Sequence, residues 1–128
     1  MEFKIDTKEK FTVIQPLEPV FNANMTADLK KVCLDFLEKE VKNVILNLEK
    51  VSEIDIDVAE TILELQQSFY EGSSSFVICA MQPAVNKVFE DEELDDMLNQ
   101  TPTESEAWDI LQMEEIEREL LDGDDYNF

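Results

Sequence analysis

The chain has 128 residues, enough for one domain with a buried core, and its 31 acidic residues against 10 basic ones give a net charge of −21. An anionic chain of this kind repels nucleic acids and anionic lipids and favours basic protein surfaces, although the same charge also keeps a small protein soluble. No apolar run approaches the roughly 20 residues of a membrane span, and Met1–Lys4 is not typical of a signal peptide, so we expect a cytoplasmic protein.

Two short strands are predicted at the N-terminus. Apolar and polar residues alternate approximately in residues 3–6 and 11–15, and the charged residues 8–10 between them are typical of a hairpin turn. Pro16 and Pro19 are expected to end this strand pairing.

A helix is predicted after these prolines, with Thr26 or Asn24 as its capping residue. Its apolar stripe has helical spacing and consists of Leu29, Val32, Cys33, Phe36 and Leu37. Cys33 lies inside this stripe and Cys79 inside a later apolar run, so both are expected to be small buried residues rather than metal ligands or disulfide partners.

The middle of the chain predicts a strand, a helix and a second strand. Residues 44–48 and 76–80 form nearly continuous apolar runs, as expected for central strands that are covered on both faces. Between them an apolar stripe at helical spacing runs from Val58 to Phe69, and the helix is expected to end near Gly72. This order of elements predicts a right-handed parallel βαβ unit.

Three further elements are predicted after this unit. A proline is expected to open a third helix over residues 83–89, because its missing amide hydrogen costs nothing in a first turn. Residues 97–99 predict a short last strand. Thr103 and Glu106 have the spacing of a capping box, so a fourth helix is predicted from there through Leu111.

The fourth helix can continue through residues 113–121 until Asp122–Asp125 ends it. The apolar residues of this continuation have roughly helical spacing and are Met113, Ile116, Leu120 and Leu121. We favour packing of these residues against their own domain, and the alternative is a stripe that binds a second chain.

Together these elements predict the α/β fold class, with a mixed sheet of four or five strands and about four helices packed on it. The expected organisation is a single domain over residues 1–112 followed by an acidic C-terminal extension over residues 113–128. Residues 1–50 carry 8 lysines and 9 acidic residues, a net of −1, whereas residues 51–128 carry 2 basic and 22 acidic residues, a net of −20. The acidic run 90–96 is interpreted as a solvated loop or as a patch that recognises a partner.

Two carboxylates, Asp55 and Asp57, lie at the turn between the first central strand and the following helix. Asp57 and Glu60 have capping-box spacing, so Asp57 is expected to start this helix and to accept a hydrogen bond from the amide of residue 60.

An Asp-x-Asp pair can also bind a metal or serve acid–base catalysis. However, hard cations need about six oxygen ligands, and the chain offers no calcium-binding loop, no phosphate-binding glycine loop, no visible nucleophile–base pair and no histidine. We therefore expect no metal, no cofactor and no enzymatic activity.

In these elements and motifs the chain resembles the STAS domain and, within it, the bacterial anti-sigma factor antagonists. The resemblance covers roughly residues 1–112 and rests on the order of the elements and on two segments, Val51–Asp55 and Cys79–Val85. It implies the STAS fold and a role in transcription regulation. Proteins of this family bind an anti-sigma factor, often a serine kinase, and so release a sigma factor.

The family's phosphorylated motif has the form Asp-Ser-Ser-Gly at the start of the second helix. Asp55 matches its aspartate, Ile56 and Asp57 fall on the two serine positions, and Val58 falls on the glycine. Asp57 has no hydroxyl for a kinase to esterify, and it carries about one negative charge where a phosphoserine carries about −1.5 to −2. The resemblance therefore implies a partner-binding protein that is not switched by phosphorylation at the usual site.

The leading hypothesis is a non-enzymatic regulatory module that binds an anti-sigma factor or a related regulatory protein, and neither nucleic acid nor a membrane. The expected partner-binding residues are Asp55, Ile56, Asp57, Glu60, Met81 and Gln82. A homodimer is left open. The alternatives are a fixed scaffold subunit of a larger complex and a small-ligand sensor domain.

Overall fold

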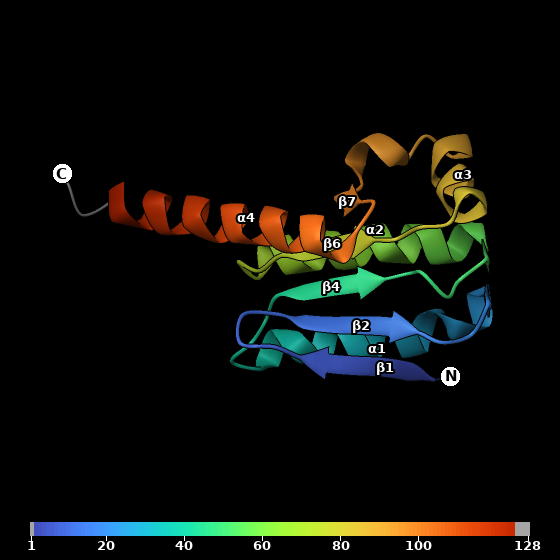
Figure 1. The fold of residues 1–128 in the computed structure, drawn as a ribbon, viewed down its shortest axis with the longest axis horizontal. Coiled ribbons are helices and arrows are strands. Elements are labelled where there is room, and N and C mark those ends of the chain that lie inside the picture. The colour runs from blue at the N-terminus through green and yellow to red at the C-terminus, as the bar shows by residue number, and fades with distance from the viewer. Residues whose placement is uncertain (1, 125–128) are drawn as a thin grey trace.

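The computed structural model describes residues 2–124, and a five-stranded sheet forms its centre (Figure 1). The strands lie in the order β1 (Phe3–Thr7), β2 (Thr12–Pro16), β4 (Val44–Asn47), β6 (Phe76–Cys79) and β7 (Gln100–Thr101). β1 pairs with β2 in antiparallel fashion, and all other neighbours pair in parallel. The predicted hairpin and the predicted parallel βαβ unit are both confirmed.

Residues 2–124 also contain four α-helices and a small second sheet. The helices are α1 (Thr26–Asp35), α2 (Ile56–Glu71), α3 (Pro83–Asp91) and α4 (Glu104–Asp124). The second sheet pairs β3 (Val20–Phe21) with β5 (Glu53–Ile54) in parallel. The single α/β domain with a mixed sheet is therefore as predicted.

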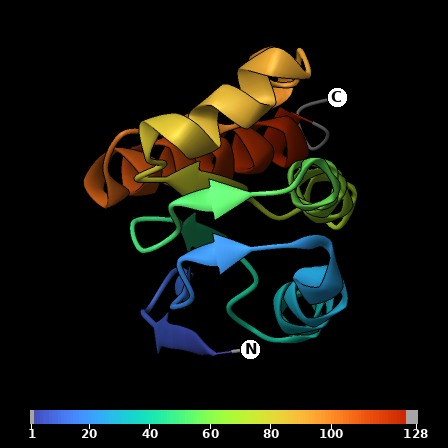
Figure 2. The ribbon, with the colours of Figure 1, turned by 90° about the vertical axis from the view of Figure 1, so that its right-hand side faces the viewer.

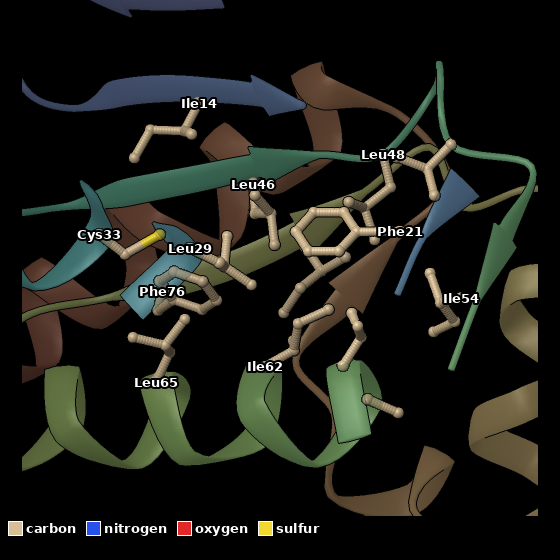
Figure 3. Packing of buried hydrophobic residues seen from close by; sticks show 14 of the residues in the cluster. Ile14, Phe21, Leu29, Cys33, Leu46, Leu48, Ile54, Ile62, Leu65 and Phe76 are labelled. Carbon is tan, nitrogen blue, oxygen red and sulfur yellow. The ribbon is translucent and has the colours of Figure 1, made fainter. Parts of the chain in front are cut away.

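Residues of the central strands alternate between the two faces of the sheet, and each face has its own cluster of buried side chains. Leu46 and Ile78 belong to the larger cluster, to which α1, α2 and α3 contribute buried side chains. Figure 3 shows Leu46 among its neighbours in this cluster. Ile45 and Val77 face the smaller cluster, which Ala107 and Leu111 of α4 cover. Burial on both faces explains why these strands are apolar at nearly every position.

The short strands are where the sequence-based prediction and the structure differ. β3 and β5 were not predicted, and the last strand is Gln100–Thr101 rather than residues 97–99. Asp95–Met97 instead forms the 3-10 turn η3, and Leu98 turns into the core with 8% of its surface exposed. Pairing with β6 starts only after this turn, where the amide of Ile78 donates to the carbonyl of Asn99 at 2.9 Å.

The predicted caps of α1 are also wrong. Its N-cap residue is Met25, without a side-chain hydrogen bond, because a 3-10 turn, η1 (Ala23–Met25), precedes the helix. Asn22 caps that turn by accepting from the amide of Asn24 at 3.0 Å, while the hydroxyl of Thr26 donates back to the carbonyl of Ala23.

α4 begins at the predicted capping box, where the hydroxyl of Thr103 accepts from the amide of Glu106 at 3.2 Å. It continues without a break past residue 112 to Asp124 and extends beyond the sheet in Figure 1. The apolar side chains predicted to pack on the domain instead stay exposed, so that expectation is wrong for Met113, Ile116, Leu120 and Leu121. Residues 125–128, part of the expected extension, lie outside the described residues.

Candidate functional site

The carboxyl ends of β4, β5 and β6 meet at one edge of the molecule, on the right in Figure 1. α2 and α3 both begin at this edge, and α3 contacts both β5 and α2. Figure 2 looks onto it, with α1 and α2 seen end-on and α3 across the top. In open α/β sheets this is the edge where functional loops commonly gather.

The turn between β5 and α2 is fastened to the N-terminal part of the chain through Asp55. Its carboxylate Oδ2 accepts from the backbone amide of Ala23 at 2.9 Å, and its own amide donates to the carbonyl of Phe21 at 3.2 Å. These two bonds fix where the strand ends and hold the turn against η1.

The predicted capping box at Asp57 is wrong, because α2 begins two residues earlier than that cap requires, at Ile56 rather than Val58. Asp55 is the N-cap residue, with extended backbone angles (φ −86°, ψ 161°), and its carbonyl accepts from the amides of Val58 and Ala59. Asp57 lies within the first turn, where its carbonyl accepts from the hydroxyl of Thr61 at 2.8 Å. The positive N-terminal end of the helix dipole still stabilises a carboxylate in this turn, typically by about 0.3–1 kcal/mol.

An apolar side chain lies exposed among carboxylates at the start of α2. Ile56 is 46% exposed, and Asp55, Asp57 and Glu60 are exposed as well. Helical spacing places Glu60 one turn after Ile56, so the two share one side of the helix. The first turn of α2 therefore presents an apolar side chain surrounded by negative charge.

Met81 and Gln82 lie at the neighbouring turn between β6 and α3 and mainly support it. Gln82 is the N-cap residue of α3, and its side-chain amide donates to the carbonyl of Glu49 at 2.9 Å. Met81 is half-buried and packs against the larger core cluster. The structure thus brings both turns to one edge, with Gln82 joined to the β4–β5 loop and not to Asp57.

The segment from Val20 to Ala23 also belongs to this edge and was not predicted. It pairs with β5 and binds the side chain of Asp55, and Val20 is itself 42% exposed. Two residues between Pro19 and Asn22 are too few for any periodicity to be visible, so the sequence carries no signal for this strand.

The acidic run after α3 lies away from the two turns. It begins at the C-terminal end of α3, and at 1.5 Å per residue this nine-residue helix is about 13 Å long. Glu90 accepts from the side-chain amide of Asn86 at 2.6 Å, and Asp91 pairs with Lys87 at 2.9 Å, so part of the run serves local contacts.

Groups for chemistry at this edge are few. Burial, with Glu104 and Glu49 nearby, raises the pKa of Cys79 to about 12, so its thiol stays protonated at neutral pH. Among the side chains that the structure describes, in residues 2–121, no group of three or more cysteines, aspartates and glutamates is placed to hold a metal ion.

A family profile described as STAS domain matches residues 2–107, and the chain belongs to this family. Solved structures share the fold at low sequence identity. tm1081 of Thermotoga maritima, a proposed anti-sigma factor antagonist, has a TM-score of 0.75 and 22% identity over 86% of this chain and 94% of that chain.

Two further structures share the fold, with somewhat lower TM-scores and identities. The Bacillus anti-sigma factor antagonist SpoIIAA in its unphosphorylated form has a TM-score of 0.69 and 19% identity, over 87% of this chain and 96% of that chain. Moorella thermoacetica RsbS with a serine replaced by glutamate has a TM-score of 0.72 and 16% identity, over 88% of this chain and 96% of that chain. No curated protein matches the chain by sequence.

Within the described residues, no helix is long and apolar enough to cross a membrane.

Proposed function

We propose that this protein is a regulatory binding module that acts as an anti-sigma factor antagonist in the bacterial cytoplasm, without enzymatic activity. The observation that carries the proposal is the first turn of α2, where exposed Ile56 lies between Asp55 and Asp57 on a turn held by the Ala23 hydrogen bond. Apolar contact by Ile56 would supply affinity, and the carboxylates would select a basic or polar partner surface.

The carboxylate of Asp57 fixes the charge at the position where the family is switched by phosphorylation. Asp57 occupies the position that the resemblance assigns to the phosphorylated serine, and its side chain is exposed in the first turn of the helix. A carboxylate there gives a constant negative charge of about one, which no phosphatase can remove. Regulation would then act through the amount of protein or of partner.

The proposed partner is an anti-sigma factor or a related regulatory protein, bound through Asp55, Ile56, Asp57 and Glu60, with Met81 and Gln82 beside them. In support, the two turns that carry these residues share one edge of the fold. Asp55 and Gln82 keep their turns in place through bonds to Ala23 and Glu49, so they are positioning residues as much as contact residues.

The test starts by identifying the regulatory proteins that the immobilised full chain retains from cell extract. A purified partner is then titrated with wild type, Asp57→Lys and the matched control Asp35→Lys, which changes an exposed acid in the last turn of α1. We expect Asp57→Lys to raise Kd at least about tenfold, or about 1.4 kcal/mol, and Asp35→Lys to leave it nearly unchanged.

A second variant, Asp57→Ser, restores the hydroxyl that a kinase needs. If the partner is a serine kinase, this variant should gain one phosphate with ATP, measured by mass spectrometry, while wild type gains none at residue 57. A chain ending at Gln112 should still bind, because the proposed domain spans residues 1–112. A partner that is lost with residues 113–128 but is indifferent to Asp57→Lys would instead identify a scaffold subunit.

A further inference from the structure

α4 has two apolar faces, of which only one is used by the domain. Ala107 and Leu111 are fully buried against the sheet, whereas Met113, Ile116 and Leu120 are 61%, 56% and 63% exposed. At about 100° per residue, these three lie within about 60° of one another on the side opposite Leu111. They are called the α4 stripe below.

The α4 stripe is a local concentration of exposed apolar surface. In the described part of the chain, four of the eleven large exposed apolar side chains lie on α4 after residue 112. The others are scattered over strands, loops and other helices, as is normal for a monomer. A contiguous apolar row at 3- and 4-residue spacing is the pattern with which a helix packs against another helix.

The helix that carries the stripe is held to the domain on its other side. Arg118 donates to the hydroxyl of Ser75 at 3.0 Å, and Glu114 accepts from the side-chain amide of Asn99 at 3.0 Å. These bonds fix the rotation of α4 beyond its buried part, so the stripe faces solvent in a defined orientation.

The surroundings of the stripe select the kind of partner. Asp109 lies in line with the stripe, one turn before Met113, whereas Glu117 lies beside the stripe by helical spacing, and both are exposed. Glu117 also lines a groove of about 730 Å³ between α2 and α4, together with Glu71 and Glu114. A second copy of this chain would bring the same carboxylates and a net charge of −21 against them, whereas lysine or arginine side chains would pair with them.

We propose that the α4 stripe docks a basic amphipathic helix of a partner protein. Apolar residues of that helix pack on Met113, Ile116 and Leu120, and its flanking cations reach Asp109 and the carboxylates of the groove. This surface lies on the part of α4 that extends away from the edge where α2 begins (Figure 1), so it is separate from the proposed antagonist site.

The test uses the full chain and a fluorescent helical peptide of about 18 residues, with leucines at the heptad a and d positions and lysines beside them. A scrambled peptide of the same composition and a peptide with glutamate in place of lysine serve as peptide controls. Protein variants are Ile116→Gln combined with Leu120→Gln, and the matched control Met97→Gln, since Met97 is 59% exposed outside α4.

We expect the double variant to weaken binding of the patterned peptide at least about tenfold and Met97→Gln to change it little. Glu117→Gln should weaken it less and reduce its dependence on salt. Equal binding of the scrambled peptide would overturn the proposal, because attraction would then be mere charge. A dimer in sedimentation that Ile116→Gln disperses would also overturn it, in favour of a second copy.

Discussion

Asn43 joins two loops at the end of the sheet opposite the candidate site. It is 7% exposed, and its Oδ1 accepts from the amide of Ser75 at 3.0 Å and from the hydroxyl of Ser74 at 3.1 Å. Its Nδ2 donates to the carbonyl of Lys10 at 3.1 Å. One side chain therefore ties the β1–β2 hairpin to the loop that enters β6.

Replacing Asn43 by alanine is expected to lower the free energy of unfolding by about 2–4 kcal/mol, because three hydrogen bonds are lost and buried polar groups remain unpaired. Urea unfolding measures the loss. Asn24→Ala is the control, since Asn24 is exposed and is expected to change stability by less than about 0.5 kcal/mol. A similar small loss in both variants would show that Asn43 is not the joint described here.

At the scale of one element, α2 ends with a Schellman motif whose left-handed residue is not glycine. The amide of Ser74 donates to the carbonyl of Phe69 at 2.8 Å, and the amide of Ser73 donates to that of Tyr70 at 3.1 Å. Ser73 has φ 57°, whereas Gly72 has φ −84°. Gly72 instead leaves room for a neighbouring side chain, because a Cβ at residue 72 would lie only 3.2 Å from Cδ2 of Leu37.

Ser73→Gly is therefore expected to raise the free energy of unfolding by about 0.5–1 kcal/mol. Glycine relieves the strain of the left-handed backbone in the folded state, and this gain exceeds the loss from the greater conformational entropy of the unfolded chain. Thermal and urea unfolding measure the gain. Ser68→Gly, within the same helix, should instead lower stability by about 0.5 kcal/mol. Loss of stability in both variants would contradict the assigned role of Ser73.

The long elements could be predicted because their patterns repeat over many residues. Two central strands were predicted correctly from the apolar runs 44–48 and 76–80. The helix between them was predicted correctly from the stripe that runs from Val58 to Phe69. That α2 is capped by Asp55 and not by Asp57 could not be predicted, because it depends on the hydrogen bond from the amide of Asp55 to the carbonyl of Phe21, which lies far away in the sequence. A cap motif at Asp57 is a local signal, and here a tertiary contact overrides it.

The candidate site shows the same division. The position of Asp55, Ile56 and Asp57 at the start of a helix, after a strand, could be predicted from sequence, and so could their meeting with the β6–α3 turn. The contribution of Val20–Ala23 could not, since a two-residue strand has no pattern. Nor did spacing alone tell that Met113 and Leu120 face solvent, because the same spacing fits a buried face.

For the whole molecule, the buried thiol of Cys33 makes stability depend on alkaline pH. Burial raises the pKa of Cys33 from 9.0 to about 12. Between these two pH values the unfolded chain loses the thiol proton and the folded chain keeps it. The contribution of the Cys33 thiol to the free energy of unfolding is therefore complete below pH 9.0 and declines as pH rises. The expected decline is about 1.4 kcal/mol per pH unit.

Urea unfolding of wild type and Cys33→Ala at about pH 8 and about pH 10 measures this decline. The alanine variant is expected to be less stable at the lower pH, since it loses packing, and the difference between the two proteins should shrink by about 1.4 kcal/mol at the higher pH. A constant difference would show that the thiol ionises equally in both states.

The two edges of the sheet limit how copies of this molecule can meet. β1 forms one edge and carries Lys4 and Asp6, and the opposite edge, β7, is only two residues long. Charged or very short edge strands are poor templates for strand addition, which is the usual start of aggregation by β-proteins. Copies crowded at high concentration are thus expected to resist joining their five-stranded sheets edge to edge.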